Sequence, residues 1–112
     1  MAKPRERDEH WQGALAELRA ICGELPAFSE TLSFGNPSFK VGRRTLAVLD
    51  AYRGATCIWL ACGSDRRAEL LLQPGYFAAP YDRTQVAVCR AAAGLDWPAF
   101  APIVRESYDR AL

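Results

Sequence analysis

The sequence predicts an α+β protein with two layers, in which helices pack mainly on one face of an antiparallel sheet. The expected order of elements is α-β-β-β-α-β-β-α. Near the N-terminus, apolar residues recur at the spacing of a helix. Tight connections that contain glycine join the strands that follow, and such short connections make neighbouring strands antiparallel. A sheet with one apolar face then needs helices to cover that face.

A helix is expected from about Asp8 to Gly23. Asp8 and Glu9 suit its positive N-terminal end, and Gly23 followed by Pro26 ends it. Its inner face is formed by apolar residues three or four positions apart: Trp11, Leu15, Leu18, Cys22 and Leu25.

The next segments read as strands. Residues 30–34 form an extended lead-in, the sequence at 35–37 makes a bend or bulge, and residues 38–41 continue the extension. Gly42 and Arg43 form a candidate two-residue turn in which Gly42 takes a positive φ. Strands are then expected over 44–52 and 55–62. Trp59 lies between bulky apolar neighbours, which predicts that it is buried in a central strand.

The second half alternates helix and strand again. Ser64 is expected to cap a helix over 65–73. The segment 76–81 predicts a short edge strand, and 84–90 predicts a clearer one. Asp96 is expected to cap the last helix, with Pro98 in its first turn.

Composition places the chain among ordinary globular proteins. It has 112 residues, of which 50% are hydrophobic and 24% charged, and we expect one domain over residues 1–112. There is no apolar run of ~18 residues and no apolar signal segment, so we expect a cytoplasmic protein without membrane contact. The formal net charge of +1 does not by itself indicate a nucleic-acid ligand.

The sequence offers little material for catalysis or for metal binding. No pair of the four cysteines has the Cys-x-x-Cys spacing of zinc and redox sites. Cys57 and Cys62 lie at odd spacing in one strand, so they should point to opposite faces. His10 is the only histidine, and no nucleophile motif accompanies it. We therefore expect no enzyme activity, no metal and no cofactor.

Several motifs along the chain resemble those of a known family. The segment 33–50 reads Ser-Phe-Gly-Asn-Pro-Ser-Phe-Lys-Val-Gly-Arg-Arg-Thr-Leu-Ala-Val-Leu-Asp, and it is similar to the signature of the MmcQ/YjbR family of small bacterial proteins. Gln73-Pro74-Gly75-Tyr76-Phe77, Leu95-Asp96-Trp97 and Arg105-Glu106-Ser107-Tyr108 follow in the family's order. The resemblance implies an antiparallel sheet with helices, shaped like type III secretion chaperones. It also implies DNA binding, by likeness to a double-wing motif of paired hairpins. Residues 82–85 depart from the pattern, because they read Asp-Arg-Thr-Gln where many members carry a basic-Gly-Trp or Lys-x-Trp feature.

Two groups of residues are candidates for binding. Lys40, Arg43, Arg44 and Arg53 flank tight turns, where they would project into solvent and contact phosphates. Basic residues at turns also keep strands soluble and block pairing at sheet edges. The second group is aromatic, and its residues would line a pocket or fill the core under a loop: Tyr76, Phe77, Tyr81 and Trp97.

The sequence therefore predicts a DNA-binding protein without enzyme activity, which contacts phosphates through basic hairpins. The alternative is a protein-interaction or chaperone-like module that binds a peptide or protein partner. The oligomeric state is not predicted.

Overall fold

A computed structural model describes residues 7–52, 54–79, 86–90 and 95–111. Among these residues the elements follow one another as α1 (Trp11–Gly23), β1 (Phe28–Ser33), β2 (Asn36–Val41), β3 (Arg44–Tyr52), β4 (Ala55–Ala61), α2 (Ser64–Leu70), β5 (Tyr76–Ala78), β6 (Val86–Arg90) and α3 (Trp97–Ala111). The predicted α+β class is confirmed.

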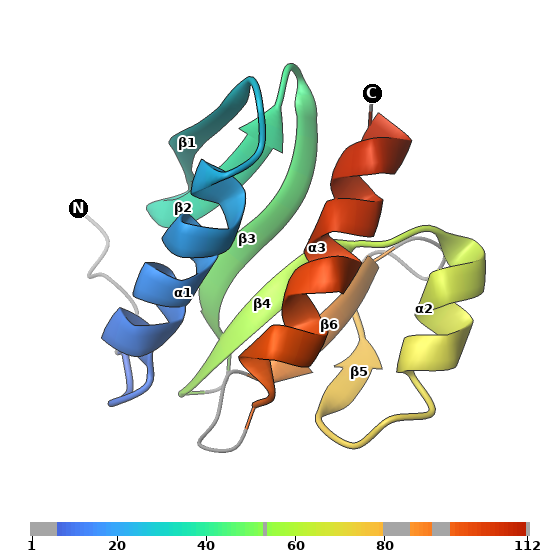
Figure 1. Ribbon diagram of the computed structural model, residues 1–112. Coiled ribbons are helices and arrows are strands. Elements are labelled where there is room, and N and C mark those ends of the chain that lie inside the picture. The colour runs from blue at the N-terminus through green and yellow to red at the C-terminus, as the bar shows by residue number, and fades with distance from the viewer. Residues whose placement is uncertain (1–6, 53, 80–85, 91–94, 112) are drawn as a thin grey trace.

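The strands form one sheet in the order β1-β2-β3-β4-β6-β5, and every neighbouring pair is antiparallel (Figure 1). The four strands from β1 to β4 are neighbours in both the sequence and the sheet. The last two strands lie in the reverse of their sequence order, because β6 pairs with β4 and β5 lies at the edge of the sheet. The predicted order of helices and strands is thus observed, with one strand more before α2.

The additional strand comes from a tight turn at Phe34 and Gly35. Both residues have positive φ, 51° and 82°, and this pair joins β1 to β2 as a hairpin. The sequence predicted a bend or bulge within one strand at this place. A bulky aromatic residue rarely adopts the left-handed conformation, so a phenylalanine at position 34 gave no signal for a hairpin turn.

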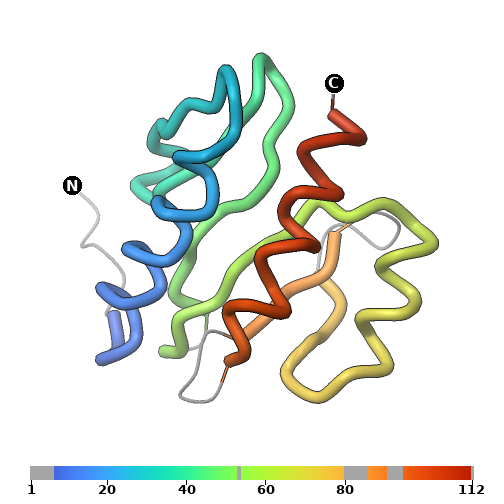
Figure 2. Tube along the Cα trace, viewed as in Figure 1, coloured from blue at the N-terminus to red at the C-terminus, as the bar shows by residue number. Residues whose placement is uncertain are grey.

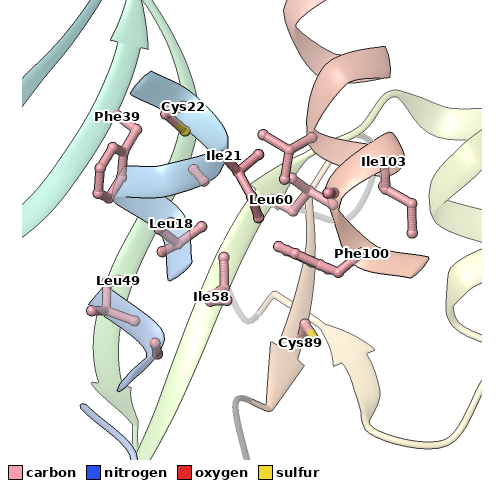
Figure 3. Close-up of a cluster of buried hydrophobic side chains, with 14 of the residues drawn as sticks. Leu18, Ile21, Cys22, Phe39, Leu49, Ile58, Leu60, Cys89, Phe100 and Ile103 are labelled. Carbon is pink, nitrogen blue, oxygen red and sulfur yellow. The ribbon is translucent and has the colours of Figure 1, made fainter. Parts of the chain in front are cut away.

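Helices cover one face of this sheet, as the sequence predicted. Figures 1 and 2 show α1, in blue, and α3, in orange to red, lying across the same face. Apolar side chains fill the space between the helices and the strands (Figure 3). The spacing along α1 is confirmed, since Trp11, Leu18 and Cys22 are buried and Leu15 packs against the same cluster.

The other face of the sheet carries a smaller apolar cluster. Cys57, Trp59 and Val88 are buried there, which confirms the predicted burial of Trp59 in a central strand. Cys62 belongs to the helix-side cluster, so Cys57 and Cys62 do lie on opposite faces. All four cysteines are buried thiols. Burial raises the pKa of Cys89 to about 11, so this thiol stays protonated at neutral pH.

In the part of the chain that the structure describes, no helix is both long and apolar enough to cross a membrane.

Candidate nucleic-acid interface

The turn between β2 and β3 presents the candidate cations. Gly42 has a φ of 58°, which confirms the left-handed conformation predicted for it. The following residue, Arg43, is exposed at the tip of the turn. Val41 and Arg44 form the pair of residues on either side of the turn. The two-residue turn therefore holds a guanidinium group in solvent at the end of the hairpin.

A bulge decides the faces on which the neighbouring cations lie. Phe39 pairs with Ala47, but Lys40 pairs with Thr45, so Leu46 is an extra residue on β3. Leu46 consequently packs on the helix side with Val41 and Tyr108, next to Ala47, which faces the same side.

Arg44 and Lys40 therefore point to opposite sides of the hairpin. Arg44 lies two residues before Leu46, and it lines a pocket beside α3 with Ser107 and Arg110. Lys40 lies between Phe39 and Val41, whose side chains both belong to helix-side clusters. Because side chains alternate along a strand, Lys40 faces the other side of the sheet.

Arg110 is a basic residue of this region that the sequence analysis did not single out. It lies in the last turn of α3, at the end of the helix that Figure 2 shows beside the β2–β3 turn. A cation in the last turn of a helix is favoured by the helix dipole. From the sequence alone, Arg110 is therefore explained by its position at the end of a helix, without any role in binding. Only the packing of α3 against the sheet brings it to Arg44.

The cations of this region differ in their pairing from three other arginines of the described chain, each of which forms an ion pair. Elsewhere, Arg19 lies 2.8 Å from Glu30, Arg66 lies 2.7 Å from Glu69, and Arg105 lies 3.7 Å from Glu24. By contrast, no described carboxylate lies within ion-pair distance of the four cations around the hairpin: Lys40, Arg43, Arg44 and Arg110. We call these four residues the basic edge. Within the described part of the chain, their charge is not neutralised by acidic side chains. The predicted contact residue Arg53 lies outside the described residues.

The predicted aromatic residues that the structure describes lie on both faces of the sheet. Tyr76 lines a cleft of about 650 Å³ beside Phe100, and burial raises its pKa. Phe77 lies on the opposite face of the sheet and stacks on Tyr52, with ring centres 5.6 Å apart. Trp97 packs edge-on against Phe100 at 5.7 Å. Tyr81 lies outside the described residues, and a pocket role for these side chains stays a prediction.

The described residues contain no group of three or more His, Cys, Asp or Glu side chains that could hold a metal ion.

Comparison with known proteins defines the class to which this fold belongs. The arrangement resembles a crystal structure of the Deinococcus radiodurans protein DR2400, which carries a domain called DUF419, with a TM-score of 0.71. The two chains are 24% identical, and the match covers 84% of this chain and 75% of the other. At this identity the likeness shows a shared fold, that of a small antiparallel α+β domain.

The family follows from the sequence comparison. A family model described as YjbR matches residues 23–110, and the chain belongs to the YjbR family. The resemblance of its motifs to MmcQ/YjbR proteins is thereby confirmed. No curated protein matches the chain.

Proposed function

We propose that the protein binds duplex DNA without enzyme activity, and that the β2–β3 hairpin contacts the phosphates. Lys40, Arg43 and Arg44 supply the contacts, together with the predicted contact of Arg53. The observation that supports this proposal is that Lys40, Arg43 and Arg44 of the basic edge lack a carboxylate partner among the described residues. Arginine suits the role because its planar group donates two parallel hydrogen bonds to a phosphate.

The placement of the cations on both faces favours insertion into a groove. The major groove of B-DNA, which is ~12 Å wide, admits a two-stranded β-ribbon. In that position Lys40 and Arg44 would face the phosphates on opposite sides of the groove, while Arg43 at the tip would point inward. A flat basic patch would instead need its cations on one face. The contacts in this arrangement are mainly to phosphates, so we expect little sequence preference.

Salt titration tests the proposal directly. Four phosphate contacts should give a slope of log K against log salt near −3.6, because each contact contributes about −0.9. The affinity should then fall roughly 150-fold between 50 and 200 mM salt. Fluorescence anisotropy with a labelled duplex of mixed sequence measures both quantities.

Two charge reversals make a matched pair for this titration. Arg43→Glu should reduce the magnitude of the slope by about 1 and weaken binding to unrelated duplexes equally. Arg105→Glu changes the net charge by the same amount on the exposed side of α3, and it should leave the slope unchanged. Wild-type protein that does not bind at 50 mM salt would contradict the proposal, as would equal losses in the two variants.

A specific observation favours a second candidate, a protein-interaction module. Phe34 at the tip of the β1–β2 hairpin is 103% exposed, and Leu32 on the adjoining edge strand is 74% exposed. Large apolar side chains exposed beside a free strand edge are typical of surfaces that bind another chain. The same titration separates the candidates, because docking through Phe34 and Leu32 requires no DNA binding.

A further inference from the structure

A small pocket lies between the start of β3, the β4–α2 connection and the end of α3. Its volume is about 230 Å³, and Arg44, Thr45, Gly63, Ser107 and Arg110 contribute to its lining. Drug-sized ligands occupy pockets of ~300–1,000 Å³. This pocket is smaller and has two guanidinium groups in its lining, so its dimensions suit one compact anionic group.

The backbone at Gly63 accommodates one of these guanidinium groups. Gly63 has a φ of 79° and a ψ of 159°, a conformation that is essentially restricted to glycine. A β-carbon built on Gly63 would lie 2.5 Å from Nη1 and 2.7 Å from Cζ of Arg110. The absence of a side chain at this position therefore lets the Arg110 guanidinium lie directly against the β4–α2 connection. Gly63, and not the predicted Ser64, occupies the N-cap position of α2.

The charge in and around the pocket is positive. No described acidic residue contributes to its lining. The exposed Asp65 and Asp109 are close in sequence to Gly63 and Arg110, yet neither forms an ion pair with a described cation. Burial raises the pKa of the nearby Cys62 thiol, and backbone hydrogen bonds together with the charges of Arg67 and Arg110 oppose that rise. Two arginines thus share a cavity without an anion from the described part of the chain.

We propose that this pocket binds a phosphomonoester group, with Arg44 and Arg110 as its two ligands. Such a group carries about −1.5 to −2 charges at pH 7 and three acceptor oxygens, so it can accept hydrogen bonds from both guanidinium groups. An internal phosphodiester has one charge and continues in both directions, which a small recess does not accommodate. Arg44 is common to this pocket and to the proposed DNA contact of the hairpin. The inference goes beyond that contact, because Arg110 and Gly63 take no part in it.

Calorimetric titration with inorganic phosphate at pH 7.5 tests the pocket. Ionic strength is held constant with chloride, so that general screening does not contribute. Wild-type protein should bind phosphate at one site. Arg110→Gln should weaken this binding roughly 10- to 100-fold, the usual effect of losing a hydrogen bond to a charged group. Arg105→Gln removes the same charge from the same helix and should bind phosphate like the wild type.

A second variant displaces the guanidinium without changing the net charge. Gly63→Ala should push Arg110 away from the β4–α2 connection and weaken phosphate binding, provided that circular dichroism shows the variant to be folded. Phosphate affinity that is equal in wild type and Arg110→Gln overturns the proposal. Equal losses in Arg105→Gln and Arg110→Gln overturn it as well.

Two further experiments identify the source of the phosphate group and distinguish phosphate binding in the pocket from DNA binding by the hairpin. A 5′-phosphorylated single strand that binds more tightly than its 5′-hydroxyl counterpart, in competition with inorganic phosphate, indicates a nucleic-acid end. Binding of inorganic phosphate without that difference indicates a small phosphorylated molecule. Both results support the pocket. Arg43→Glu should weaken duplex binding and keep phosphate binding, whereas Arg110→Gln should do the reverse, so either proposal can fail alone.

Discussion

Replacement of Trp59 by alanine should lower the free energy of unfolding by roughly 3–5 kcal/mol, the usual cost of removing a large aromatic side chain from a core. Trp59 is only 6% exposed. It lies on β4 between Val48 of β3 and Val88 of β6, and the ring of Tyr52 meets it edge-on at 5.9 Å. The cavity left by alanine would open in the middle of the sheet, where neighbouring strands cannot collapse around it. Urea denaturation followed by circular dichroism measures the loss.

A matched substitution separates the contribution of the buried ring of Trp59 from that of the hydrogen bond that its indole N–H donates to Asp50. Trp59→Phe keeps an aromatic ring and removes the indole N–H, so it should cost clearly less than alanine. A loss below ~1 kcal/mol for Trp59→Ala would contradict the burial of this residue, because only surface changes have effects that small.

Removal of the Asp50 carboxylate should have an effect of similar size. Asp50 is 8% exposed and accepts hydrogen bonds from the backbone N–H of Ala51 at 2.7 Å and from Nε1 of Trp59 at 3.1 Å. The side-chain amide of Asn36 donates a third bond at 3.2 Å. A buried donor left without an acceptor costs about 1–3 kcal/mol. Asp50→Ala removes the acceptor of all three hydrogen bonds, two of which are buried, and should therefore cost about 2–6 kcal/mol.

A double-mutant cycle tests whether this network is the cause. In the Trp59→Phe background one donor is already absent, so Asp50→Ala should cost less there than in the wild type. Asp109→Ala on the exposed side of α3 serves as the control and should change stability by less than about 0.5 kcal/mol. Identical costs of Asp50→Ala in the two backgrounds would show that Asp50 does not stabilise the protein through Trp59.

The elements that the sequence predicted well are those with a local signal, either the spacing of buried apolar residues or a helix cap. The apolar spacing of Trp11, Leu18 and Cys22 predicted α1, and the bulky run around Trp59 predicted a central strand. Asp96 was expected to cap the last helix, and its Oδ1 accepts a hydrogen bond from the N–H of Ala99 at 3.1 Å. In these cases the conformation that the local sequence favours is also the one that the tertiary structure needs.

The arrangement of the candidate site depended on features with no such local signal. Regular alternation along β3 would place Arg44 on the same face as Asp50, away from the helices. The extra residue at Leu46 reverses this, and Leu46 packs in one cluster with Tyr108, which is distant in the sequence. Arg110 meets Arg44 only through the position of α3. The sequence therefore indicated Arg44 as a candidate cation, and the fold determined that it lies beside Arg110.

The order of strands also has a consequence for the kinetics of folding. The hairpins from β1 to β4 pair segments that adjoin in the sequence, so each closes a short loop at little entropic cost. β6 must instead return to β4 across α2 and β5. We expect the four-stranded meander to form in the transition state and β6 to dock afterwards. Leu49→Ala on β3 should then slow folding, whereas Val88→Ala on β6 should mainly speed unfolding. Equal φ-values at the two positions in stopped-flow experiments would contradict this sequence of events.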